Sequence, residues 1–257
     1  MNPVKIETAQ GVMTATLADV ANRNALGAEL LRGLHDALAA ANADPAIRAL
    51  VVTNEGSTFC AGANLKEASR GSAAPRGATR LETLLQEIQV SPTPVIGRIA
   101  GHVVGGGNGL ACAFDISIAA DDARFGFTEV RLGVVPAIIS VVCLPKMRRG
   151  EAMEVFLRGH RFSATRAVEL GLINRAVPAA ELDAAVEEVL ADLRKGGPNA
   201  LGVAKRLVHE VPRMTQEEAF QWTSRLSADL FASDEAAEGM KAWLDKRTPN
   251  WAKEDDE

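Results

Sequence analysis

The sequence predicts an α/β fold, in which mostly parallel strands are covered by helices on both faces and are followed by a helical C-terminal region. Three observations lead to this prediction. Short β-type runs alternate with runs whose apolar residues recur every three or four positions. Turns rich in glycine and alanine follow two of the strand-like runs. After Gly150 the composition becomes almost continuously helical.

The N-terminal part of the chain supplies the first strands and the first helix. Residues 4–7 and 11–17 alternate like the two strands of a hairpin, with a turn at residues 9–11. A helix then follows, because apolar residues recur at spacings of three and four, and Asp44-Pro45 ends it. Residues 47–53 form the next predicted strand.

The same strand and helix pattern repeats in the middle of the chain. Thr79-Arg-Leu-Glu82 has the form of a capping box that opens a helix, and Pro92 ends that helix. Residues 95–100 and 115–119 are predicted strands. Both faces of such a sheet are normally covered by helices.

The C-terminal part is predicted to contain successive helices with one strand-like run, 172–177, between them. Thr215-Gln-Glu-Glu218 is a second capping box. The predicted helices span residues 151–157, 163–170, 182–193, 200–210, 216–231 and 234–244.

Composition bounds the function. The chain has 257 residues, of which 47% are hydrophobic, which is enough for a buried core. Aromatic residues make up only 4% and the net charge is -5. A nucleic-acid-binding domain usually carries a basic excess and aromatic stacking residues, so no nucleic-acid partner is expected.

The cysteines and the N-terminus indicate a reduced compartment. Cys60, Cys112 and Cys143 are odd in number and far apart, so they predict neither disulfides nor a zinc site. The N-terminus lacks the basic and apolar regions of a signal peptide. The longest apolar run, 134–144, is too short to cross a bilayer. We therefore expect a cytoplasmic protein without a membrane segment.

Two turns built from small residues are the candidate functional elements. Gly105, Gly106 and Gly107 stand between a strand-like run and a helix-like run, where bare backbone N–H groups can face a ligand. Ala61-Gly-Ala63 follows another strand-like run and offers a second such turn. Each triplet alone is also compatible with a tight crossover that serves only packing. Two converging turns favour a site that holds an anion or an oxyanion.

These segments resemble the crotonase family, which is the enoyl-CoA hydratase/isomerase superfamily. The resemblance extends over most of the chain and includes Phe59-Cys-Ala-Gly-Ala-Asn-Leu-Lys-Glu67, the glycine triplet and Phe127-Thr-Glu-Val-Arg-Leu-Gly-Val-Val-Pro136. It implies a spiral of β-β-α units over residues 1–195 and a helical trimerisation region over 196–257. It also implies an acyl-CoA thioester substrate, no separate cofactor, and a homotrimer or a hexamer made of two trimers.

The resemblance assigns the catalytic roles. It implies that the amides of Ala61 and Gly106 hold the thioester oxygen and that Glu129 is the acid/base. From the residues alone, a surface glutamate paired with Arg124 or Arg131 is the favoured interpretation, and the resemblance reverses this preference. Hydratases of this family carry a further glutamate, and here Gly109 stands at its position.

A single glutamate leaves the reaction open. It is compatible with hydration of a 2-enoyl-CoA, which is our first expectation, with isomerisation of a 3-enoyl-CoA, and with a catalytically silent scaffold that binds acyl-CoA. The segment from Glu129 to Ser140 is most similar to hydratases of the methylglutaconyl-CoA type. We expect Gly109 to vacate space that a branched or carboxylated acyl chain can occupy.

Further residues are expected to bind the substrate. The resemblance implies that the Asn22–Leu26 turn and residues 63–66 hold pantetheine and nucleotide, with Arg23 and Lys66 as phosphate partners. The chain has no complete dinucleotide, P-loop or metal motif, so we expect no metal. Residues 68–79 are predicted to form a mobile loop. The complete set of expected substrate-binding residues is Arg23, Ala25, Ala63, Asn64, Leu65, Lys66, Gly105 and Gly109.

Overall fold

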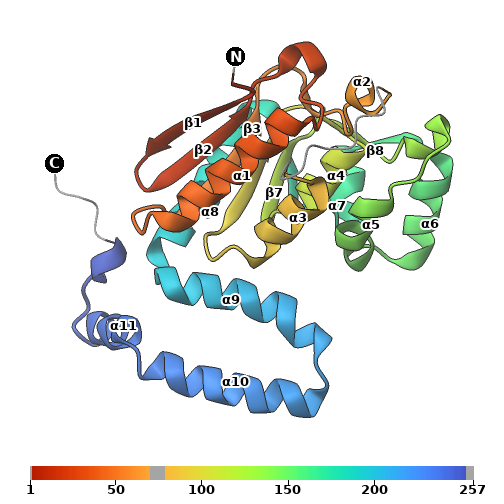
Figure 1. Cartoon of the computed structure of the whole chain (residues 1–257). Helices are drawn as coiled ribbons and strands as arrows, with labels where there is room; N and C mark the ends of the chain where they lie inside the picture. The colour runs from red at the N-terminus through yellow and green to blue at the C-terminus, as the bar shows by residue number, and fades with distance from the viewer. Residues whose placement is uncertain (1, 70–78, 253–257) are drawn as a thin grey trace.

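The computed structural model describes residues 2–69 and 79–252, which form two sheets with helices packed around them (Figure 1). The larger sheet has the strand order β1-β2-β3-β5-β7-β10. In this sheet β1 and β2 pair antiparallel as the predicted hairpin, and every other neighbouring pair is parallel. Its strands are β1 (Val4–Ala9), β2 (Val12–Leu17), β3 (Ala49–Asn54), β5 (Val95–Ile99), β7 (Ile116–Ala120) and β10 (Arg175–Val177).

A smaller sheet of three-residue strands positions the glycine turns. Its order is β4-β6-β8-β9, and β4, β6 and β8 run parallel while β9 is antiparallel to β8. Because three of the strands are parallel neighbours, the segments that follow them emerge at one edge of the sheet. The strands are β4 (Thr58–Cys60), β6 (His102–Val104), β8 (Arg124–Gly126) and β9 (Arg161–Ser163).

Helices cover both faces of the large sheet. Along β3, Leu50 and Val52 belong to the main core cluster with α1, α3 and α4, whereas Ala49 and Val51 pack with α8. Every residue of β3 is buried, as expected for a parallel strand between two helical layers. The helices of this part are α1 (Ala28–Ala43), α2 (Leu65–Ala68), α3 (Leu81–Val90), α4 (Gly106–Ala113), α5 (Ala137–Cys143), α6 (Arg149–Arg158), α7 (Ala164–Glu169) and α8 (Leu182–Lys195).

The predicted capping box at the start of α3 is wrong. The helix begins at Leu81 with Arg80 as its N-cap residue, and that cap makes no side-chain hydrogen bond. The Glu82 carboxylate instead forms an ion pair with Arg80 at 2.5 Å. In a capping box the Glu82 carboxylate would accept a hydrogen bond from the backbone N–H of Thr79, but here it pairs with Arg80 instead.

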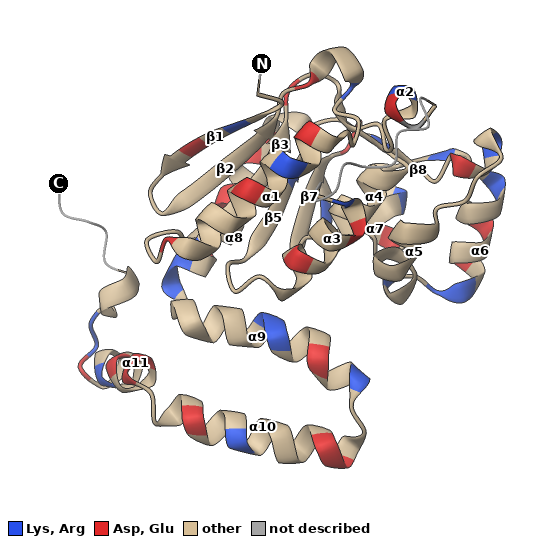
Figure 2. Cartoon of the chain, viewed as in Figure 1, with Lys and Arg blue, Asp and Glu red and all other residues tan. Residues whose placement is uncertain are grey.

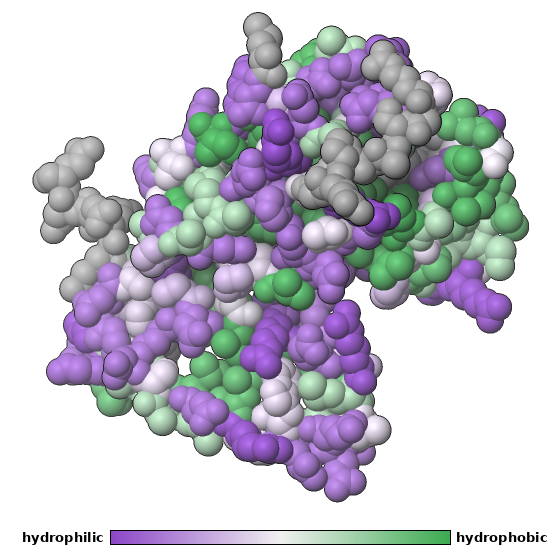
Figure 3. Space-filling model, in the orientation of Figure 1, coloured by the Kyte–Doolittle hydropathy of each residue, from purple (hydrophilic) through white to green (hydrophobic). Residues whose placement is uncertain are grey.

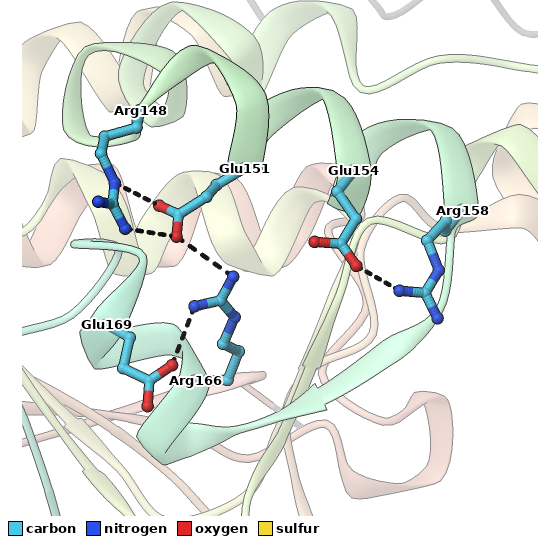
Figure 4. Close-up of polar contacts among 6 residues, drawn as sticks. All are labelled: Arg148, Glu151, Glu154, Arg158, Arg166 and Glu169. Carbon is cyan, nitrogen blue, oxygen red and sulfur yellow. Dashed lines mark hydrogen bonds and ion pairs between the residues drawn. The ribbon is translucent and has the colours of Figure 1, made fainter.

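Helix α6 is linked to α7 by charged side chains (Figure 4). The guanidinium of Arg166 contacts Glu151 at 3.3 Å and Glu169 at 2.9 Å, and Glu151 also pairs with Arg148 at 2.7 Å. The contacts lie near the surface, where solvent screens the charges, so each contributes little to the stability of the fold.

The C-terminal helices extend away from the sheets (Figure 1). They are α9 (Pro198–Glu210), α10 (Gln216–Phe231) and α11 (Asp234–Leu244). The predicted capping box of α10 is confirmed, because Thr215 Oγ1 accepts from the Glu218 N–H at 3.3 Å and Glu218 Oε2 accepts from the Thr215 N–H at 2.9 Å. Lys205 on α9 is tied to the core by a contact of 2.8 Å between its Nζ and Asp115 Oδ2.

Short 3-10 helices connect several of these elements. Basic and acidic residues are interspersed over the chain (Figure 2). In the view of Figure 2, both basic and acidic positions occur along α9 and α10. No helix in the described ranges has the length and apolar character needed to span a membrane. The 3-10 turns are η1 (Val20–Asn22), η2 (Glu129–Leu132), η3 (Leu144–Lys146), η4 (Ala179–Glu181), η5 (Val211–Arg213) and η6 (Asn250–Ala252).

Candidate active site

A cavity of about 430 Å³ lies at the edge where β4, β6 and β8 end. The turn Ala61–Ala63, the turn Gly105–Gly106 and Glu129 all line it. Three segments that are far apart in the sequence therefore meet in one place. Much of the remaining wall is apolar and includes Leu26, Leu31, Leu81, Val135, Ile138 and Ile139.

The two turns touch through glycines whose conformations require glycine. Gly62 has φ of +84° and Gly105 has φ of +55°, which L side chains rarely adopt. A methyl group on Gly62 would lie 3.0 Å from the Val104 carbonyl oxygen and 3.1 Å from the Gly106 nitrogen. The absence of side chains thus allows the two backbones to approach closely.

The amide of Ala61 is already used inside the protein. Its N–H donates to the carbonyl oxygen of Arg23 at 3.1 Å. The N–H groups of Ala63 and Gly106 have no acceptor within the described part of the chain. The structure therefore brings the expected donors Ala61 and Gly106 to one cavity, but the unengaged amide of the first turn is that of Ala63.

Glu129 is half-buried at the start of η2. A methyl group on Gly105 would lie 3.4 Å from Glu129 Oε1, so the carboxyl group sits against the glycine turn. Its Oε2 is buried and has no hydrogen-bond partner among the described residues. Within the same residues, the carboxylate forms no ion pair with Arg124 or Arg131. Burial raises the pKa of this carboxyl group, and a hydrogen bond from its own backbone N–H partly opposes the rise.

Gly109 does not open space, contrary to the sequence-based expectation. It is buried in α4, and a Cβ atom added to it would overlap with Ile139 Cγ2 on α5 and lie 3.5 Å from Leu85 Cδ1. Ile139 is 3% exposed and lines the cavity. An aliphatic side chain therefore fills the place that a second glutamate would need.

The expected substrate-binding cations lie at the surface. Arg23 is exposed and ends η1 in a left-handed conformation. Lys66 Nζ donates to Asn22 Oδ1 at 3.1 Å, which brings the two predicted segments together. Ala25, in contrast, is buried.

Asn64 and Leu65 differ in their surroundings. The Asn64 side chain caps α2, because its Oδ1 accepts from the backbone N–H groups of Lys66 and Glu67. Leu65 is 57% exposed and lines the cavity. The loop predicted at 68–79 falls largely on residues 70–78, which lie outside the described residues.

Cys60 lies behind the first turn. Its thiol is fully buried, and burial raises its pKa to about 12 despite a hydrogen bond from the Gly62 N–H at 3.4 Å. The thiol is therefore uncharged at neutral pH and lacks the reactivity of a thiolate.

Two residues near the site were named in the sequence analysis only as members of longer segments. Ile139 was treated only as part of a motif, and its position beside Gly109 depends on how α5 packs on α4. Asn24 is fully buried, and its Nδ2 donates to the Thr58 carbonyl at 2.8 Å. Its φ of +51° is one that asparagine tolerates better than most residues, so the asparagine itself was the available signal in the sequence.

The chain also matches a known family. Residues 7–254 match the family model described as "Enoyl-CoA hydratase/isomerase". The chain belongs to the enoyl-CoA hydratase/isomerase family.

Individual relatives are similar over their full length. The enoyl-CoA hydratase EchA19 of Mycobacterium tuberculosis is 30% identical over 256 residues, covering 96% of this chain and 95% of that protein. A solved enoyl-CoA hydratase of Mycobacterium smegmatis superposes with a TM-score of 0.90 at 29% identity, covering 98% and 99% of the two chains. AtuE of Pseudomonas aeruginosa gives a TM-score of 0.90 at 32% identity, covering 98% and 100%. The protein thus has the crotonase fold.

Proposed function

We propose that the protein is an enoyl-CoA hydratase-type lyase that adds water to the double bond of a 2-enoyl-CoA thioester. The observation that carries this proposal is the Glu129 carboxyl group, which has an unpartnered oxygen and a raised pKa beside two turns with unengaged amides. A raised pKa makes the carboxylate a stronger base, and the carboxylic acid that it becomes can return the proton.

In the proposed reaction the thioester oxygen accepts hydrogen bonds from two backbone amides. Glu129 removes a proton from water as the water oxygen bonds to the β-carbon. The π electrons of the double bond move toward the carbonyl and form an enolate. The Glu129 carboxylic acid then returns the proton to the α-carbon. Each amide donor contributes about 3 kcal/mol to stabilising the enolate-like transition state.

We assign the two donors to Ala63 and Gly106. The Ala61 N–H is excluded from this role in the present arrangement because it donates to Arg23. The Ala63 N–H lies two residues further along the same turn and has no acceptor in the described ranges. Gly106 is the first residue of α4, so its N–H also benefits from the positive end of the helix dipole.

A second candidate reaction is isomerisation of a 3-enoyl-CoA to a 2-enoyl-CoA. The packing of Ile139 against Gly109 favours it, because an apolar wall replaces a group that could position water. In this reaction Glu129 would take a proton from the α-carbon and deliver it to the γ-carbon. A single carboxylate is sufficient for that transfer.

The acyl group is proposed to be apolar, either straight or branched. Among the described residues that line the cavity, the charged side chains are Glu82 and Glu129, and none is basic. A carboxylated acyl chain would therefore meet negative charge without a cationic partner. The charges of the cavity therefore favour an apolar acyl chain over the carboxylated chain of a glutaconyl-type substrate, which the sequence had suggested.

Purified protein should be assayed with crotonyl-CoA, 3-methylglutaconyl-CoA and a 3-enoyl-CoA. Hydration of crotonyl-CoA that falls at least 100-fold in Glu129→Gln supports the lyase, whereas conversion of only the 3-enoyl-CoA supports the isomerase. Glu82→Gln is the matched control, because Glu82 also lines the cavity but pairs with Arg80. Binding of each thioester without turnover would instead identify a catalytically silent scaffold.

The coenzyme A part of the substrate is proposed to lie over the Asn22–Leu26 turn, with Arg23 and Lys66 near its phosphates. Both cations are exposed at the rim formed by η1 and α2, and Lys66 contacts Asn22. No separate cofactor is needed for the proposed steps. Replacing both cations by Gln should raise KM for the acyl-CoA and leave kcat nearly unchanged.

We propose that α9 to α11, within residues 196–257, associate with other copies in a homotrimer or a hexamer. These helices expose several large apolar side chains, and Figure 3 shows apolar surface between α9 and α10. Sedimentation equilibrium tests the assembly, and a monomer at micromolar concentration would contradict it. The exposed side chains are Val208, Phe220, Phe231, Met240, Trp243 and Leu244.

A further inference from the structure

We propose that Asn108 is a positioning residue that orients the Gly106 N–H toward the cavity and fixes its position relative to Glu129. This inference rests on the proposed function, because it concerns the same site. Asn108 is 1% exposed and is the third residue of α4. It does not line the cavity, so any effect on the reaction must pass through its neighbours.

The Asn108 side chain bridges two backbone carbonyl groups. Its Nδ2 donates to the Gly105 carbonyl oxygen at 3.2 Å and to the Gly126 carbonyl oxygen at 3.0 Å. The backbone N–H of Asn108 also donates to the Gly105 oxygen, at 2.9 Å. The Gly105 carbonyl is therefore held from the side of α4 by two donors of one residue.

Holding this carbonyl fixes the direction of the proposed catalytic amide. The Gly105 carbonyl and the Gly106 N–H belong to the same planar trans peptide, so they point in opposite directions. When Asn108 holds the oxygen toward the helix, the N–H must face away from it, toward the cavity that Gly106 lines. Gly105 is free to rotate as a glycine with φ of +55°, so an external constraint is required.

The second carbonyl connects this peptide to the acid/base. The Gly126 oxygen accepts from Asn108 Nδ2 and also from the Gly105 N–H, at 3.0 Å. Gly126 ends β8, three residues before Glu129. Asn108 thus links the turn that carries the amide donor to the segment that carries the carboxyl group.

The chemistry of the side chain supports a role beyond filling space. One amide nitrogen supplies two N–H donors, so a single side chain can add a hydrogen bond to each of the two carbonyl groups, both of which also accept a backbone N–H. The Asn108 Oδ1, however, is buried and has no hydrogen-bond partner in the part of the chain that the structure describes. A buried acceptor without a partner destabilises the fold, so stability alone would favour an apolar residue here.

The test compares wild type with Asn108→Leu, which has a side chain of similar size, loses the two side-chain hydrogen bonds and keeps the backbone N–H bond to the Gly105 carbonyl. We expect kcat to fall about 100-fold while KM changes less than threefold, because the amide acts mainly on the transition state. Ser117→Ala is the matched control. Ser117 is also 1% exposed and donates to the Ala111 carbonyl of the same helix at 2.7 Å, remote from the cavity.

A second measurement does not depend on turnover. Bound acetoacetyl-CoA should show an increased ultraviolet band of its enolate in the wild-type protein, since the two amides favour the oxyanion. We expect this band to be lost in Asn108→Leu and retained in Ser117→Ala. If Asn108→Leu does not fold, Asn108→Ser replaces it, because its hydroxyl can donate to only one carbonyl; the band and kcat should then be intermediate.

The outcomes distinguish a failure of the proposed function from a failure of the role assigned to Asn108. A wild-type protein that neither binds acetoacetyl-CoA nor turns over thioesters overturns the proposed function. A wild-type enolate band that persists in the Asn108 variant, or a kcat lowered no more than in Ser117→Ala, overturns the role of Asn108. Loss of the band in a folded Asn108 variant that still binds acetoacetyl-CoA, with the band retained in Ser117→Ala, supports it.

Discussion

The side chain of Ile139 fills the volume beside the Cα of Gly109, where α5 crosses α4. The two residues fit together because Gly109 has no side chain, and any side chain at this position would overlap with Ile139. The site consequently has one carboxyl group at the glycine turn and an aliphatic wall beside it.

This packing predicts how a second carboxylate can be introduced. Gly109→Glu alone should destabilise the fold by about 3 kcal/mol, because the new side chain overlaps with Ile139. Gly109→Glu combined with Ile139→Gly should regain stability relative to the single variant and hydrate crotonyl-CoA faster than Ile139→Gly. Urea unfolding and hydration assays check this. A Gly109→Glu variant as stable as wild type would show that the space beside Gly109 is not filled by Ile139.

The raised pKa of Glu129 predicts opposite effects of pH on activity and stability. As a base it must be ionised, so kcat/KM should rise with pH through a midpoint above the ordinary glutamate value of about 4.3. The folded protein binds this proton more tightly than the unfolded chain, so the free energy of unfolding should fall over the same range. Glu129→Gln should therefore raise Tm at pH 7 and not at pH 3.5. An identical change in Tm at both pH values would contradict the raised pKa.

The assignment of Ala63 predicts different results for two backbone substitutions. Replacing the Ala63 amide by an ester removes its N–H and should lower kcat about 100-fold with little change in stability. The same replacement at Ala61 removes the hydrogen bond to Arg23 and should cost about 1 kcal/mol of stability. Turnover and thermal unfolding of the two semisynthetic proteins distinguish the roles. The reverse pattern would restore Ala61 as the donor.

The buried pair Lys205 and Asp115 predicts how α9 is held on the core. Burial raises the pKa of Asp115 and lowers that of Lys205, although each group is partly stabilised by the other. Lys205→Met should therefore destabilise the protein by about 3–5 kcal/mol, because Asp115 keeps only the Val95 N–H as a described partner. Asp115→Asn with Lys205→Met should recover much of the loss. Equal urea midpoints for the single and double variants would contradict this.

The sequence predicted much of the fold because the relevant patterns are local. The hairpin of β1 and β2, the apolar stripe of α1 and the capping box at Thr215 each follow from residues close in the chain. The small sheet was not predicted as a sheet, because strands of three residues are too short to show a period of two. The pairing of β9 with β8 also depends on a distant contact.

The site was predicted in composition but not in detail. The two turns were located as runs of small residues, whereas Glu129 was assigned through the family resemblance, because its spacing alone favoured a surface glutamate. The choice between Ala61 and Ala63 depends on the direction of peptide groups, which no side chain reveals. The space at Gly109 was misjudged because Ile139, thirty residues later, fills it.

The most direct test follows the α-proton of a bound acyl-CoA thioester in deuterated water by NMR. The account predicts exchange by the wild-type protein, unchanged exchange by Glu82→Gln, and exchange reduced at least 100-fold in Glu129→Gln. Exchange by Glu129→Gln at the wild-type rate would show that another group moves the proton and would contradict the account.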